Sequence, residues 1–129
     1  MVTNLSSLVT FHSSLDNEPL KEKFKQAHVL IVPSSYEGFG IVYLEGMAFG
    51  LPAIGTTAGA AGEIIEHGKT GYLIEPNDST TLSTYISQFA SDRNLLGELS
   101  LNARKRYIQQ LSWNETAGQI RAFLQSMIG

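Results

Sequence analysis

The chain has 129 residues, of which 43% are hydrophobic and 16% are charged, and its formal net charge is −3. This length and composition are typical of one globular domain, and the lack of a basic excess argues against nucleic acid or an anionic membrane as partner. The absence of cysteine excludes disulfides and thiol chemistry. The N-terminus shows no signal pattern and no apolar run reaches the length of a membrane span, so we expect a cytoplasmic protein.

Strand and helix signals alternate along the first part of the chain. Short apolar segments rich in β-branched residues predict strands at residues 8–11, 29–32, 53–56 and 72–74. Apolar residues at helical spacing predict helices at about residues 19–27, 41–49 and 63–66. The run at 29–32 is aliphatic without polar alternation, which is typical of a parallel strand that is covered on both faces.

The rest of the chain is predicted to be helical. Asp78 is a plausible N-cap for a helix to about residue 90, and Asp92 for a second helix to about residue 111. Ser112 and Glu115 have the spacing of a capping box, which predicts a separate last helix. The alternation of strands and helices therefore predicts an α/β, Rossmann-like domain with a parallel sheet of about four strands, helices on both faces and a helical C-terminal part.

Two loops of this predicted fold are suited to ligand binding. Residues 33–40 and 56–62 each follow a strand, precede a helix and are rich in small residues. Parallel sheets bind ligands beyond the carboxyl ends of their strands, and the amides at a helix N-terminus can bind a phosphate. Both loops are therefore candidates for one binding site.

One carboxylate stands out between these loops. Glu45 is the single charged residue from Gly38 to Gly62, in a segment that is otherwise apolar or small. Such a carboxylate is neutralised, hydrogen-bonded by the protein or reserved for a ligand. Spacing alone leaves open whether Glu45 binds a ligand or is a structural carboxylate that accepts from backbone amides.

Glu37 lies eight residues before Glu45, and the residues between them add to the ligand interpretation. Gly38 and Gly40 allow the backbone to turn tightly and approach a ligand closely. A helix that starts near Ile41 offers free amides to a diphosphate. Two carboxylates that could accept from sugar hydroxyls would then lie on either side of it. This arrangement suggests a nucleotide-sugar.

Several motifs in this order resemble the retaining glycosyltransferases of the GT-B fold, of the group 1 or family 4 type. The motifs are AHVLIVPS (27–34), EGFG (37–40), LEGMA (44–48), GLP (50–52) and GEII (62–65). The resemblance extends from about residue 8 to residue 113. It implies that the chain is a partial domain, residues 1–129, from the donor-binding C-terminal half of such an enzyme.

The resemblance also implies roles for individual residues. Glu37 would be the catalytic or charge-stabilising residue, and Glu45 would bind the ribose hydroxyls of the nucleotide. The backbone at residues 39–40 would contact the donor sugar, and the amides at residues 41–42 the diphosphate. The donor-binding set is Ser34, Gly38, Phe39, Gly40, Ile41, Val42 and Glu45. The donor would be a nucleotide diphosphate sugar, and no cofactor or metal is expected.

The chain matches only part of the enzymes of this family. The acceptor-binding N-terminal domain and the first strand–helix units of the donor domain are absent from it, so we expect the isolated chain to be inactive. In the family sheet, two further strands separate those that match residues 8–11 and 29–32. Without them a strand edge is exposed, and exposed edges promote association. We therefore expect rearranged strand pairing or self-association.

Other functions remain open at the level of the sequence. The chain could be a non-catalytic α/β remnant or an interaction module that completes a sheet with a partner chain, because the cationic phosphate ligands of the family are absent. A third candidate is a relative of the sugar-nucleotide epimerases or of the phosphorylases, because these enzymes share the fold. The EGFG loop argues against both of these enzymes.

Overall fold

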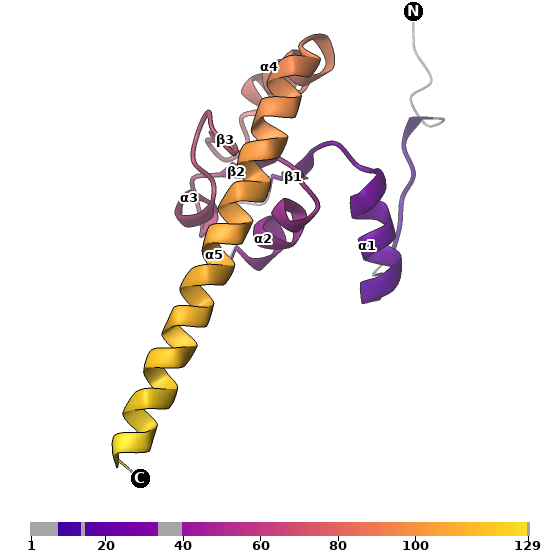
Figure 1. Ribbon diagram of the computed structural model, residues 1–129. Helices are drawn as coiled ribbons and strands as arrows, with labels where there is room; N and C mark the ends of the chain where they lie inside the picture. Colours follow the sequence, from indigo (N-terminus) through magenta and orange to yellow (C-terminus); the bar gives the residue numbers. More distant parts are fainter. Residues whose placement is uncertain (1–7, 14, 34–39, 129) are drawn as a thin grey trace, which may run out of the picture.

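A computed structural model of the chain describes residues 8–13, 15–33 and 40–128. Eight elements follow one another along it (Figure 1). They are α1 (Asn17–Gln26), β1 (Leu30–Val32), α2 (Ile41–Ala48), β2 (Ala53–Thr56), α3 (Ala61–Ile64), β3 (Gly71–Ile74), α4 (Ser79–Ser91) and α5 (Arg93–Ile128).

The strands form a parallel sheet in the order β1-β2-β3. Ile54 pairs with Ile31 on one side and with Tyr72 on the other, so β2 is the central strand. In the described part of the chain β1 pairs with β2 alone, and its outer edge is open. The predicted parallel α/β sheet is confirmed, but the described residues form three strands of it instead of about four.

The predicted strand at residues 8–11 is wrong. Residues 9–13 have no regular structure, and the side chains of Leu8 and Phe11 are 77% and 92% exposed. The segment lies away from the sheet (Figure 1). Strand propensity depends on a paired neighbour and on a surface to pack against, and this segment has neither of them among the described residues.

Helices cover both faces of the sheet, as predicted, because alternate residues of β2 point in opposite directions. Ala53 belongs to a cluster with residues of α2 and α3, including Tyr43 and Met47. Ile54 belongs to a second cluster, with Phe89 of α4 and Leu99 of α5. The sheet therefore lies between two apolar layers, with α2 and α3 on one face and α4 on the other.

Helix α2 lies directly against the open-edged strand β1. A Cβ atom at Gly46 would come within 2.9 Å of Leu30 Cδ2, so the Leu30 side chain would have to shift to admit a larger residue. Gly46 and Met47 are buried on this face of α2. Helix α2 therefore contacts the side chain of Leu30 in β1, and it also packs against α5, α3 and β2.

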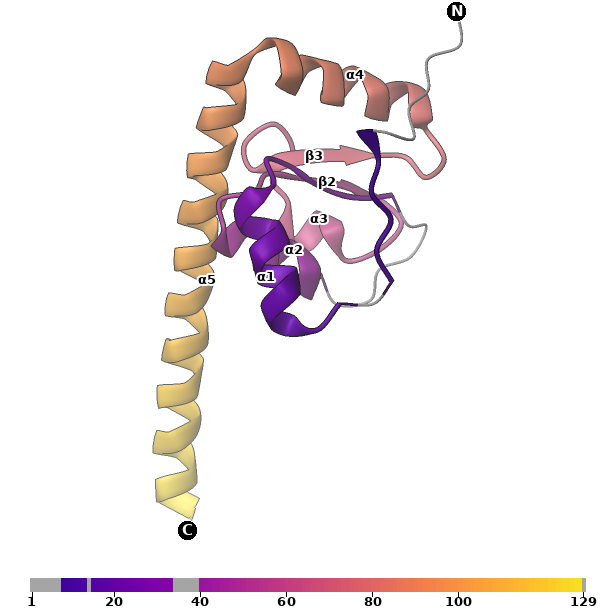
Figure 2. The same ribbon diagram turned by 90° about the vertical axis from the view of Figure 1, so that its right-hand side faces the viewer.

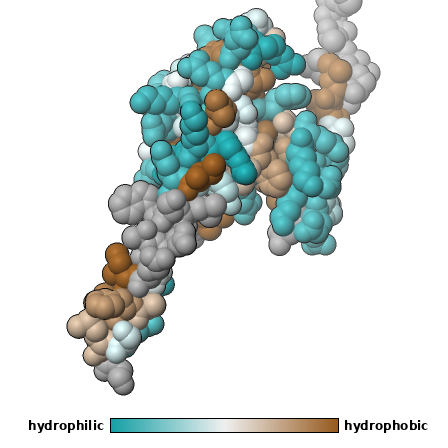
Figure 3. Space-filling model, in the orientation of Figure 1, coloured by the Kyte–Doolittle hydropathy of each residue, from teal (hydrophilic) through white to brown (hydrophobic). Residues whose placement is uncertain are grey.

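Helix α5 is continuous for 36 residues, so the predicted break before a last helix at Ser112 is wrong. A capping box acts only where the chain leaves helical geometry, and no Gly or Pro interrupts residues 98–117. The far half of α5 extends away from the sheet (Figures 1 and 2). Apolar residues gather at this free end (Figure 3), where Ile120, Phe123 and Met127 are more than half exposed.

The N-terminus of α4 is capped by Asp78, as predicted. Asp78 Oδ1 accepts from the backbone N–H of Thr81 at 3.1 Å, and Oδ2 accepts from the Thr81 hydroxyl at 2.7 Å. The hydroxyl bond first, and the backbone bond second, lower the pKa of Asp78 below its usual value. The cap therefore works best when Asp78 is ionised.

We expect this cap to lose stabilising effect in acid. Because the folded-state pKa is lowered, the carboxylate contributes stability that is fully present above the unfolded pKa of about 3.9 and is lost as pH falls through the folded pKa. Asp78→Asn keeps a capping oxygen but does not titrate. The melting-temperature difference between the two proteins, followed by circular dichroism, should be constant above about pH 5 and shrink below about pH 4. A constant difference across both ranges would contradict this account.

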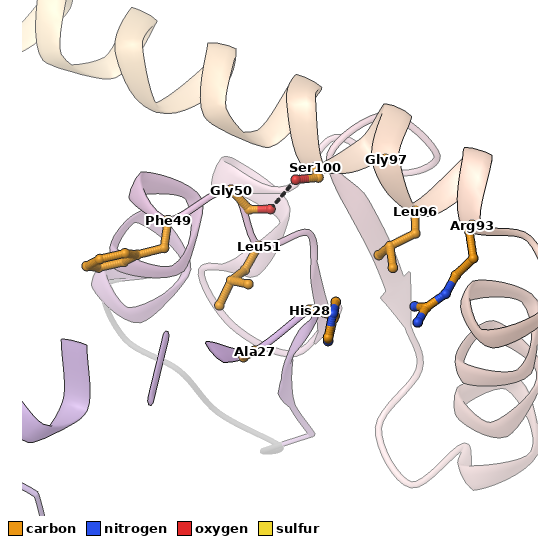
Figure 4. A pocket seen from close by; sticks show the side chains of 9 residues that line it. All are labelled: Ala27, His28, Phe49, Gly50, Leu51, Arg93, Leu96, Gly97 and Ser100. Atoms are coloured by element: carbon orange, nitrogen blue, oxygen red, sulfur yellow. Dashed lines mark hydrogen bonds between the residues drawn. The ribbon is translucent and has the colours of Figure 1, made fainter. Parts of the chain in front are cut away.

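The turn between α2 and β2 is anchored to α5 at the amino ends of the strands (Figure 4). Ser100 Oγ donates to the carbonyl oxygen of Gly50 at 2.6 Å. Gly50 has a φ of 74°, and a Cβ there would come within 3.2 Å of Ser100 Oγ. Gly50 and Ser100 line a cavity of about 360 Å³, which His28 and Arg93 also line. This cavity lies at the opposite end of the sheet from the carboxyl ends of the strands.

Replacing Ser100 with alanine should destabilise the fold by about 1–2 kcal/mol, because the Gly50 carbonyl loses its partner in a partly buried place. Urea denaturation would measure the change. Ser91→Ala is the matched control, since its hydroxyl donates to the Ser87 carbonyl at 2.9 Å on the exposed surface of its own helix. An effect of Ser100→Ala no larger than that of the control would contradict the anchoring role.

Candidate functional site

The described part of the candidate site is built around the N-terminus of α2. Gly40 is the N-cap residue and has a φ of 67°, a conformation that favours glycine. A Cβ there would come within 2.9 Å of Ile64 Cγ1, so the close approach of α3 also requires glycine. The Gly40 carbonyl accepts from the amides of Tyr43 and Leu44 at 3.2 Å and 3.4 Å.

This capping leaves the first amides of α2 directed out of the helix. The N–H groups of Ile41 and Val42 belong to the first turn, where no preceding helical carbonyl can accept from them. They carry the positive end of the helix dipole. The site therefore presents backbone donors at the carboxyl end of β1, and their role in binding a diphosphate stays a prediction.

Glu45 lies one turn further along α2, on the side of the helix that faces away from the sheet. It is exposed, as is Ile41 four residues earlier, whereas Tyr43, Gly46 and Met47 are buried. Among the described residues the Glu45 carboxylate makes no hydrogen bond or ion pair. The structural alternative, a carboxylate turned inward and bonded to backbone amides, therefore has no support in the described part of the protein.

Glu45 borders a groove between α1 and α2, which we call the α1–α2 groove. Its volume is about 430 Å³, within the range of small-molecule sites. Phe24 of α1 packs against Phe49 after α2, with 5.8 Å between ring centroids. The lining residues are Leu20, Lys21, Phe24, Ile41, Leu44, Glu45, Ala48, Phe49 and Tyr107. The groove thus combines apolar walls with one basic and one acidic side chain.

The second predicted loop, between β2 and α3, lies at the same edge of the sheet. The Thr57 amide donates to the Ile74 carbonyl at 2.9 Å, and its hydroxyl donates to Glu75 Oε2 at 3.2 Å. Next to it a cavity of about 270 Å³ lies among Pro33, Thr56 and Asn77. The second loop and the two described residues of the first loop, Pro33 and Gly40, thus adjoin the carboxyl ends of the strands.

The structure brings together some of the predicted residues. Gly40, Ile41, Val42 and Glu45 lie on one helix end, but their assignment to a donor stays a prediction. The other predicted site residues, Ser34, Glu37, Gly38 and Phe39, lie outside the described residues. Sequence reasoning missed Lys21, whose place on the groove depends on how α1 packs and has no local signal.

The described residues contain neither a metal-binding cluster nor a membrane-spanning helix. No group of three or more His, Asp or Glu side chains lies close enough to hold a metal ion in the parts that the structure describes. Likewise, none of the helices in these parts is both long and apolar enough to cross a lipid bilayer.

Comparison with known proteins connects this geometry to a family. The family model "Glycosyl transferases group 1" matches residues 3–106. The N-acetyl-alpha-D-glucosaminyl L-malate synthase of Bacillus anthracis is 33% identical over 116 residues, which cover 90% of this chain and 30% of that protein. This chain thus spans less than a third of the length of that relative.

Solved structures support the same relationship. Sucrose-phosphate synthase from Thermosynechococcus elongatus superposes with a TM-score of 0.83 at 32% identity, over 97% of this chain and 31% of that one. Anabaena Alr3699/HepE in complex with UDP-glucose gives a TM-score of 0.72 at 28% identity, over 81% of this chain and 29% of that one. The fold is that of the C-terminal domain of GT-B glycosyltransferases. The chain belongs to the glycosyl transferases group 1 family.

Proposed function

We propose that this chain binds the nucleotide-sugar donor of a glycosyltransferase. Combined with an acceptor-binding domain, it would transfer the sugar with retention of configuration. The observation that carries the proposal is the pairing of outward-facing amides at Ile41 and Val42 with the exposed carboxylate of Glu45 one turn later. The amides suit a diphosphate, and the carboxylate suits a pair of ribose hydroxyls.

Electrostatics support this order of groups along α2. The helix N-terminus favours negative charge, and Glu45 lies far enough along α2 to avoid the diphosphate while still accepting from hydroxyls. Diphosphate binding by backbone amides and the helix dipole needs no metal, so we propose metal-independent binding. Glu37 remains our candidate for the catalytic residue, by the resemblance of the EGFG loop.

Binding of UDP-glucose by the related Anabaena protein makes UDP the first ligand to test. Isothermal titration calorimetry of the folded 129-residue chain with UDP, GDP and ADP should detect binding of at least one of them, without added divalent metal. Circular dichroism would establish that the sample is folded. A folded sample that binds none of the three nucleotides would contradict the proposal for this chain.

The open edge of β1 favours a second candidate function, an interaction module that completes its sheet with a partner chain. Unpaired N–H and C=O groups along an edge strand form a template for another strand. Light scattering distinguishes the two cases, because an interaction module without nucleotide affinity should associate and fail to bind in the titration above. Nucleotide binding by a monodisperse monomer would exclude this second candidate.

A further inference from the structure

The cavity at the amino ends of the strands has no part in the proposed donor contacts. Its volume of about 360 Å³ is within the range of small-molecule sites. Three parts of the chain line it: the residues just before β1, the turn between α2 and β2, and the first turns of α5 (Figure 4). We call it the His28–Arg93 cavity. The proposed donor contacts at Ile41, Val42 and Glu45 use none of its lining residues.

Two nitrogen-bearing side chains meet at this cavity. Arg93, the first residue of α5, extends toward His28, which precedes β1 (Figure 4). In the described part of the chain none of the lining residues is acidic, and neither Arg93 nor His28 makes a hydrogen bond or an ion pair through its side chain. The adjacent carboxylate of Asp92 already accepts from the N–H of Leu95, at 3.0 Å. The donors of the guanidinium and the imidazole are therefore available to a ligand.

Apolar side chains line the same cavity. Leu51 and Leu96 are 2% and 8% exposed, and both border it. A second cavity of about 180 Å³, lined in part by the buried ring of Phe89, shares His28, Arg93 and Leu96 with the first. Apolar walls exclude water, and this strengthens hydrogen bonds to a charged group beside them. The His28–Arg93 cavity thus offers cationic donors and an apolar surface to one ligand.

From these observations we propose that the His28–Arg93 cavity binds a small organic oxyanion, a carboxylate or a phosphate monoester with an apolar body. Arg93 binds two of its oxygens, because the planar guanidinium presents paired donors that match such groups. His28 donates one N–H to the same group. The apolar body packs against Leu51 and Leu96. This site is separate from the proposed donor site and does not depend on it.

Titration of the ¹⁵N-labelled chain with phenyl phosphate and with benzoate, followed by NMR, tests the site. The amide signals of residues 50–51 and 93–97 should shift with at least one of these probes, and the probe that binds more tightly identifies the anionic group. Inorganic phosphate lacks the apolar body, so it should bind at least about tenfold more weakly than phenyl phosphate if the group is a phosphate. No shift with either probe up to about 10 mM would overturn the inference.

Arg93→Met should weaken binding of the probe by about tenfold or more, because it removes the charged donors and keeps much of the apolar stem. Arg121→Met is the matched control, since Arg121 is exposed on the far half of α5 and does not line the cavity. The control should bind the probe like the wild type. The same spectra show whether each variant is folded.

A second variant tests the cavity itself. Gly97 lines it, and a Cβ atom there would meet no other atom within 4 Å, so a leucine would enter open space. Leucine also favours a helix over glycine, so Gly97→Leu should keep the fold and weaken binding of the probe by about tenfold. Unchanged affinity in Gly97→Leu or in Arg93→Met would overturn the inference, as would shifts at the amides of Ile41 and Val42 instead. UDP binding at α2 is measured separately, so either proposal can fail while the other stands.

Discussion

Replacing Glu45 with glutamine should weaken UDP binding by about 10- to 100-fold. The carboxylate offers two acceptor oxygens and a full charge to the ribose hydroxyls, and hydrogen bonds to charged groups contribute about 1.5–3 kcal/mol each. Glutamine keeps the size of the side chain but offers a single acceptor. Isothermal titration calorimetry would measure the loss.

The same variant should leave the fold intact. Glu45 is exposed and has no protein partner among the described residues, so the free energy of unfolding should change by less than about 0.5 kcal/mol. Glu98→Gln, on the exposed surface of α5, is the matched control and should alter neither property. Wild-type affinity in Glu45→Gln would remove Glu45 from the site. A large loss of stability would instead favour the structural interpretation of this carboxylate.

The second large effect is expected at Gly71, where β3 begins. Gly71 pairs with Ala53 of β2, and a Cβ atom at residue 71 would overlap the Ala53 carbonyl oxygen. Because the obstacle is backbone, no side-chain rotation relieves the clash. Gly71→Ala should therefore destabilise the protein by about 3 kcal/mol or more in urea denaturation, a large part of the stability of a small domain.

Gly97→Ala is the control for this prediction. A methyl group at residue 97 would meet nothing within 4 Å, and the residue lies inside α5. Alanine is favoured over glycine in a helix by about 0.5–1 kcal/mol, so this variant should be more stable than the wild type. If Gly71→Ala and Gly97→Ala shift the denaturation midpoint in the same direction, the close contact of Gly71 with Ala53 does not exclude a side chain at residue 71.

The sequence predicts those parts of the fold that depend on short-range pattern. The strands near residues 30–32, 53–56 and 71–74 are found within one residue of their expected bounds, because each is apolar and bounded by Pro, Gly or polar residues. The same kind of signal at residues 8–11 fails, because among the described residues this segment lies away from the sheet and pairs with none of its strands. A local capping motif at Ser112 likewise fails, because the surrounding residues favour a continuous helix.

The sequence likewise predicts one part of the candidate site and fails to predict another. The N-terminus of α2 follows from glycine placement and helical periodicity, whereas the spacing left open whether Glu45 is exposed or turned inward, and the structure shows it exposed. The facing wall of the α1–α2 groove does not follow, because it depends on contacts such as Phe24 with Phe49 that join distant segments. Pairs of this kind leave no periodic signal in a single sequence.

The tight fit of Gly46 against Leu30 links two surfaces of the molecule. A strand that joined the free side of β1 would set the twist and lateral position of β1, and a shift of β1 would act on α2 through the contact of Leu30 with Gly46. The amides that we assign to the donor move with α2. Recruitment of a neighbouring chain and affinity for the donor would then be thermodynamically linked, each changing the other by the same factor.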